Sequence, residues 1–133
     1  MSNESETEYT KSIEIQEKLV IEENRIELTN DLAKSYWGKG IVLDKIGKIK
    51  EAIEFYDKAI ELWEETLQRG EVQNLPNMAI VLGIRFDTHR KAGNTDSAEK
   101  DMQRLYQLLE ITKQHKEIEH LGSYIQTEID ERS

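Results

Sequence analysis

Apolar residues recur at steps of three and four along residues 49–67, and most positions between them are polar or charged. This spacing is the period of an α-helix with one buried face. It predicts an amphipathic helix whose stripe consists of Ile49, Ala52, Ile53, Tyr56, Ala59, Ile60, Trp63 and Leu67. Helical patterns in the rest of the sequence predict an all-α protein with helices near residues 4–28, 30–46, 48–69, 75–92, 95–113 and 115–130.

Helix-breaking residues separate these segments. Gly47 and Gly93 stand where two helices should end, and Asn30-Asp31 offers an N-cap for the segment that follows. Pro76 suits the first turn of a helix.

Two further segments have apolar patterns that predict where their helices lie in the fold. Residues 78–86 are apolar nearly all round, so we expect neighbours on both sides of this helix. The last helix has one apolar face, as a terminal capping helix requires. That face consists of Ile118, Leu121, Tyr124, Ile125 and Ile129.

The chain repeats itself at a spacing of 46 residues. Moving residues 31–64 forward by 46 positions aligns small residues and the turn glycine with their counterparts. The aligned pairs include Ala33 with Ala79, Gly47 with Gly93, and Ala52 with Ala98. The second copy is degenerate, because Gly40 becomes Phe86. Residues 8–20 also align with residues 55–67, which indicates a second helix that lacks its first.

Residues 33–62 resemble one tetratricopeptide repeat, a helix–turn–helix unit that stacks on copies of itself. The residues that carry the resemblance are Tyr36, Gly40, Leu43, Gly47, Ala52, Tyr56 and Ala59. The spacing of 46 exceeds the 34 residues of the standard unit, so the chain is similar to the longer repeats of bacterial arrays and kinesin light chains. The resemblance implies a right-handed α-solenoid of five to six antiparallel helices that holds another protein.

We expect a single tetratricopeptide-like domain over residues 1–133. Its predicted parts are a partial repeat with only a second helix (4–28), a full repeat (30–70), a degenerate repeat (75–113) and a capping helix (115–130).

Composition narrows the function further. The net charge of −9 disfavours nucleic-acid and anionic-membrane partners, which need a basic surface. The chain has no cysteine, and no apolar run approaches the ~20 residues of a membrane helix. His115 and His120 are five apart, which does not place two metal ligands on one helical face. We expect a soluble cytoplasmic protein with no metal, no cofactor and no enzymatic activity.

In the resembled family, the first helices of the repeats line a concave groove. The corresponding segments, 30–47 and 76–93, carry six Lys or Arg against three Asp, which implies a mildly basic groove suited to an acidic peptide. The alternative is that these charges are ordinary solvated residues. The predicted groove residues are Lys34, Trp37, Ile41, Lys45, Asp87 and Arg90.

The two tryptophans are expected to play different roles. Trp37 is the candidate anchor for a ligand; the alternative is that it packs against the N-terminal helix or the tail. Trp63 belongs to the apolar stripe, so we expect it in the core. Chaperone-binding members of the family need Lys and Asn where Trp37 and Ile41 stand, which excludes that ligand.

The N-terminal segment suggests a second class of function. A second helix without its first leaves an apolar side uncovered, and such surfaces form interfaces. Either the tail helix folds back over this side, or another chain covers it and the protein is a homo-oligomer or a subunit of a larger assembly. The candidate interface residues are Tyr9, Ile13, Leu19 and Val20.

Overall fold

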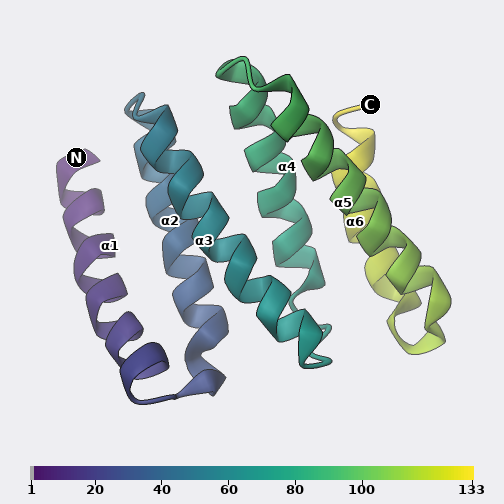
Figure 1. Ribbon diagram of the computed structural model, residues 1–133, viewed down its shortest axis with the longest axis horizontal. Coiled ribbons are helices and arrows are strands. Elements are labelled where there is room, and N and C mark those ends of the chain that lie inside the picture. The colour runs from purple at the N-terminus through teal and green to yellow at the C-terminus, as the bar shows by residue number, and fades with distance from the viewer. Residues whose placement is uncertain (1) are drawn as a thin grey trace. The chain divides into compact units, whose positions relative to one another are not determined.

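A computed structural model describes residues 2–133 (Figure 1). The described residues form six α-helices and three short π or 3-10 segments, with no strand among them, so the predicted all-α class is confirmed. The α-helices are α1 (Ser2–Glu17), α2 (Thr29–Lys45), α3 (Ile49–Gln68), α4 (Leu75–Lys91), α5 (Thr95–Gln114) and α6 (Gly122–Asp130). The short segments are η1 (Lys18–Glu22, π), η2 (Ile26–Leu28, 3-10) and η3 (Lys116–Leu121, 3-10).

The four central helices have the predicted bounds to within one residue, but both outer predictions of one continuous helix are wrong. The N-terminal helix ends at Glu17, and Asn24 reverses the chain with a φ of 54°, a left-handed conformation that asparagine tolerates. Near the C-terminus, His115 is extended and a 3-10 segment precedes α6. Helical periodicity continues through both breaks in the sequence, so periodicity alone did not reveal them.

The chain divides into two compact units, Met1–Thr66 and Leu67–Ser133, here called unit 1 and unit 2. Unit 1 contains α1, α2 and nearly all of α3, and unit 2 contains α4, α5 and α6. The division into repeats within a single domain stays a prediction.

In unit 1, α1 and α3 both pack against α2 in the antiparallel sense. The end of α1 meets the middle of α2 where the Tyr36 hydroxyl donates to Glu17 Oε2 at 2.5 Å. The end of α3 meets the start of α2 where the Trp63 indole N–H donates to Asn30 Oδ1 at 2.8 Å. Asn30 therefore fixes a core tryptophan instead of capping α2, which begins after Leu28. Because α1 and α3 run in the same direction, α1 has the orientation expected of a second helix.

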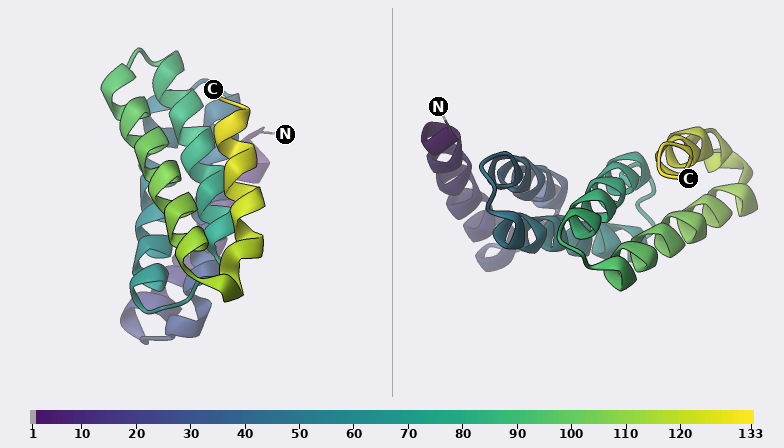
Figure 2. Two further views of the ribbon diagram at one scale, coloured as in Figure 1. Left: turned by 90° about the vertical axis from the view of Figure 1, so that its right-hand side faces the viewer. Right: turned by 90° about the horizontal axis from the view of Figure 1, so that it is seen from above.

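In unit 2, α4 lies beside both α5 and α6 (Figure 2). Met78, Ala79, Val81 and Leu82 are all buried, which confirms that this helix is covered on more than one side. Arg85 on α4 pairs with Asp101 near the start of α5, so these two helices are antiparallel. Arg132, just after α6, contacts Asp87 near the end of α4, so α6 runs parallel to α4. The last helix thus takes the direction of a further first helix.

The turn glycines of the two aligned copies have the same geometry. Gly47 and Gly93 have φ of 85° and 81°, where a side chain would be strained. In each turn the glycine N–H and the following N–H bond back to the last turn of the preceding helix, as Gly47 N to Asp44 O at 3.1 Å and Asn94 N to His89 O at 2.8 Å show. The repetition seen in the sequence is therefore also a repetition of backbone structure at these two turns.

Candidate functional site

The four predicted groove residues of unit 1 share one side of α2. Lys34, Trp37, Ile41 and Lys45 follow one another at steps of three and four, which places them in a row along the helix. Lys34 and Lys45 are exposed, while Trp37 and Ile41 are half-buried. The row therefore presents two apolar side chains between two cations.

Trp37 is held in place by the core of unit 1. Its ring meets the ring of Trp63 edge to face, with centroids 6.2 Å apart and an interplanar angle of 74°. Trp63 is 1% exposed, which confirms its predicted place in the core. This contact places Trp37 against α3. The alternative to ligand binding named the N-terminal helix or the tail as its neighbour. An aromatic side chain that is half-exposed and already fixed loses little conformational freedom on binding.

Other basic residues near this surface are engaged within unit 1. Lys39 Nζ donates to Thr10 Oγ1 at 2.8 Å and lies 4.7 Å from the centre of the Phe55 ring. Lys58 Nζ lies over the rings of both Tyr36 and Phe55. Burial and the neighbouring Glu17 carboxylate raise the pKa of the Tyr36 hydroxyl, so this group stays a neutral donor. The hydrogen bonds from Tyr36 to Glu17 and from Lys39 to Thr10 join α1 to α2. Lys34 and Lys45 are the exposed cations of the row.

In unit 2, the predicted residues of α4 have partners of their own. Asp87 accepts from Arg132 Nη2 at 3.0 Å, and the Arg90 guanidinium lies 5.7 Å from the centre of the Phe86 ring. Arg85, which contributed to the predicted basic character, is paired with Asp101 and is 19% exposed. Arg85 is thus neutralised within unit 2, whereas Arg90 contacts a ring and keeps its charge.

The N-terminal segment exposes different residues from those predicted. Ile13 and Val20 are buried within unit 1, and Tyr9 packs its ring over Gly38, where a Cβ atom would clash with it. Leu19 is half-buried. The exposed apolar side chains are Ile15 (63%), Ile21 (67%) and Ile26 (50%). The prediction that Ile13 and Val20 lie on an uncovered side is corrected, because both are buried within unit 1. Of the exposed isoleucines, Ile15 lies on α1, Ile21 in η1 and Ile26 in η2.

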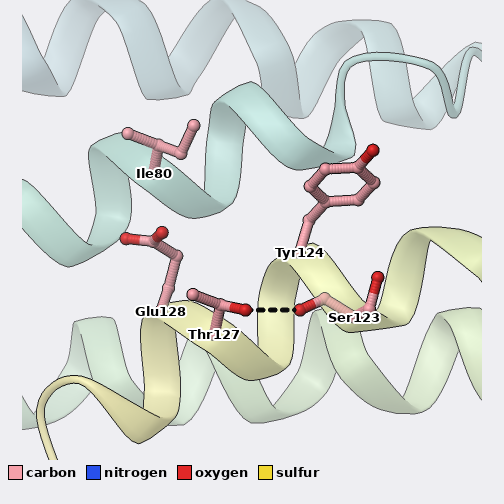
Figure 3. A pocket seen from close by; sticks show the side chains of 5 residues that line it. All are labelled: Ile80, Ser123, Tyr124, Thr127 and Glu128. Atoms are coloured by element: carbon pink, nitrogen blue, oxygen red, sulfur yellow. Dashed lines mark hydrogen bonds between the residues drawn. The ribbon is translucent and has the colours of Figure 1, made fainter.

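A hollow of about 320 Å³ lies between α4 and α6 in unit 2 (Figure 3). It is lined by Ile80 from α4 and by Ser123, Tyr124, Thr127 and Glu128 from α6. Tyr124 was expected on the buried face of the last helix, but it is 56% exposed at the edge of this hollow. The sequence analysis did not identify the hollow, because residues from two helices 43 positions apart (Ile80 to Ser123) form it.

Arg132 contacts Glu128, one of the residues that line the hollow. Its guanidinium donates to the Gly83 carbonyl at 2.8 Å, to Asp87 and, at 3.1 Å, to Glu128 Oε1. A Cβ atom on Gly83 would occupy the place of this guanidinium, so the glycine makes room for it. Glu131 Oε2 lies 3.6 Å from Arg132 Nη1. Three carboxylates thus share one cation, and the local charge is negative.

We predict that Glu128→Gln does not lower stability at neutral pH, although it removes an ion pair. Burial, together with the charges of Glu131 and Asp87, raises the Glu128 pKa despite the opposing effect of Arg132. A carboxyl whose pKa is raised by folding destabilises the fold once it ionises, so this penalty appears as the pH rises above its ordinary range. Thermal unfolding of both proteins across pH 4–8 should show the variant at least as stable at pH 7. A clear loss of stability at pH 7 would contradict the prediction.

Among the side chains that the structure describes, those of residues 5–133, no three His, Asp or Glu converge where a metal ion could be held. Over the same residues, no helix combines the length and the apolar character needed to cross a membrane.

The fold and these surfaces define a helical scaffold of the class that serves protein–protein interaction. Residues 33–64 match the family model described as "Tetratricopeptide repeat". This match covers residues 33–64 of the 133-residue chain and supports one tetratricopeptide repeat there. No curated protein and no solved structure matches the chain. Repeats of this family are interaction modules and in general not catalysts, whereas the long-repeat variant stays a prediction.

Proposed function

We propose that the protein binds a segment of a partner protein on the α2 row, with Trp37 and Ile41 as apolar anchors. The observation that carries the proposal is the Trp37 side chain, which is half-exposed yet fixed by the buried Trp63 ring. Aromatic residues held in this way are enriched among the residues that dominate binding energy. The mechanism is equilibrium binding without turnover.

Charge selects the partner of this row. Lys34 and Lys45 are exposed at its two ends, one turn or less from the anchors. An acidic segment would gain electrostatic steering and correct register from these cations. Asp87 and Arg90, which are exposed on α4 of unit 2, stay proposed partner contacts of that unit by itself.

The proposal predicts that Trp37→Ala combined with Arg90→Glu abolishes partner capture and leaves the helicity unchanged. Truncating an aromatic anchor costs about 2 kcal/mol or more of binding free energy, and the charge reversal adds repulsion to an acidic partner. The measurement is capture of partners from native lysate, with identification by mass and circular dichroism of each variant.

A matched control makes the same kinds of change on another helix. Tyr106→Ala with Lys100→Glu removes an exposed aromatic side chain and reverses a charge on α5. This variant should capture the same partners as the original chain. Undiminished capture by the Trp37 and Arg90 variant would overturn the proposal.

The alternative function is self-assembly or docking into a complex through the N-terminal segment. The observation in its favour is the exposure of three isoleucines, Ile15, Ile21 and Ile26, within one short stretch of the sequence, where their apolar side chains are accessible to a partner. Light scattering over a concentration series tests the self-assembly form. Association that Ile15→Ser and Ile21→Ser weaken together would support it, whereas a monomer at every concentration would contradict it.

A further inference from the structure

We propose that the hollow between α4 and α6 is a second binding site, which receives a basic side chain and a neighbouring aliphatic side chain from a segment of a partner protein. The inference rests on the proposed function, because it assumes that the protein is an interaction module. It names a different surface from the α2 row and a partner segment of opposite charge.

The shape of the hollow fits side chains of a peptide. Its volume of about 320 Å³ is at the lower end of the range of about 300–1,000 Å³ for small-molecule pockets. The lining residues Ser123, Tyr124 and Thr127 are exposed, so the hollow opens to solvent along α6. A shallow site of this size, open along a helix, suits one or two side chains of a segment that lies across it.

The apolar part of the site is formed by two side chains from different helices. Ile80 on α4 and the ring of Tyr124 on α6 both line the hollow (Figure 3). The Thr127 hydroxyl donates to the Ser123 carbonyl at 2.9 Å, so this group is satisfied within its own helix. An aliphatic side chain placed between Ile80 and Tyr124 would bury the exposed ring without leaving this hydroxyl unpaired.

The charge of the site favours a cation. Glu128 lines the hollow with its side chain 14% exposed, and Arg132, which it contacts, is shared with Asp87 and Glu131. Three negative groups against one positive group leave a surplus that an ammonium or guanidinium group would offset. The raised pKa of Glu128 has the same cause, namely burial next to other carboxylates. The net charge of −9 adds long-range attraction for a basic partner.

A titration of the isotope-labelled full chain tests the inference. The probe is a short synthetic helical peptide with leucine and lysine at steps of three and four, and the comparison peptide has glutamate in place of lysine. We expect the lysine peptide to shift the amide signals of Ile80 and residues 123–128, with weaker binding at higher salt. The glutamate peptide should leave these signals unchanged.

Variants of the lining residues assign the contacts. Glu128→Gln should weaken binding of the lysine peptide about tenfold, the effect of losing one charge-assisted contact. Tyr124→Ala should weaken it about fivefold through the lost apolar contact. The matched controls are Glu99→Gln and Tyr106→Ala, which make the same changes at exposed positions of α5 and should bind as the original chain does.

The outcomes separate this inference from the proposed function. Shifts confined to α2, equal binding by the two peptides, or equal binding by Glu128→Gln and Glu99→Gln would each overturn the α4–α6 site. None of these results bears on partner capture through Trp37, which the earlier double variant tests. Undiminished capture by the Trp37→Ala and Arg90→Glu variant, with an intact response in the titration, would instead overturn the proposed function and keep an interaction site in unit 2.

Discussion

Replacing Asp101 with alanine is expected to lower the free energy of unfolding by about 3 kcal/mol or more. The Asp101 side chain is 3% exposed, and the Arg85 guanidinium bonds both its oxygens, with Nε 3.1 and 3.0 Å away and Nη2 2.5 Å from Oδ1. The alanine variant removes the buried carboxylate that accepts these hydrogen bonds from an arginine that is only 19% exposed. Because the pair joins α4 to α5, the loss should fall on unit 2.

Urea denaturation followed by circular dichroism measures this loss, and amide exchange locates it. The control is Glu99→Ala, two residues earlier on α5 and exposed, which should change stability by no more than about 0.5 kcal/mol. Equal effects of Asp101→Ala and Glu99→Ala would show that the pair does not stabilise unit 2.

Replacing Trp63 with alanine is expected to cost about 3–5 kcal/mol, the range for truncating a buried large aromatic side chain. The side chain is 1% exposed, and its indole N–H is the partner of Asn30 Oδ1. The variant therefore leaves a cavity and an unpaired amide oxygen at the same place in unit 1. It should also release Trp37, whose ring contacts Trp63, and so weaken partner capture.

Two further variants separate these effects. Trp63→Phe keeps most of the ring volume and loses the hydrogen bond, so its cost should be smaller, about 1–3 kcal/mol. Trp37→Ala truncates a half-buried side chain and should cost clearly less than Trp63→Ala while still impairing capture. Urea denaturation with fluorescence of the remaining tryptophan provides the measurement. A Trp63→Ala loss no greater than that of Trp37→Ala would contradict the assignment of Trp63 to the core.

The central helices were predictable because their local signals agree with their packing. In α3 the apolar stripe continues for five turns, and Ala52, Tyr56, Ala59 and Trp63 on that stripe are all buried. Gly47 and Gly93 end their helices because only glycine adopts the left-handed turn at little cost. The outer segments were less predictable, since the breaks at Asn24 and His115 occur in charged stretches with no proline or glycine.

The candidate surfaces could be predicted only where one helix forms them. Lys34, Trp37, Ile41 and Lys45 lie in one row because the helical period places them there, and the sequence contains that period. The neighbour of Trp37 and the partners of Arg85 and Asp87 could not be found in this way, because each lies on another helix. The basic character of the groove stays a prediction.

The amino-acid sequence by itself determined the all-α class, the central helix bounds, the repeat at residues 33–64 and the negative net charge, since these follow from local periodicity, turn residues and composition. Only the tertiary structure decided which charges are neutralised, which isoleucines stay exposed and where a hollow forms. Those properties depend on side chains from helices far apart in the sequence, such as Ile80 with Tyr124 and Asp87 with Arg132. No single segment of the sequence contains a signal for these contacts, because they form only when helices far apart in the sequence pack together.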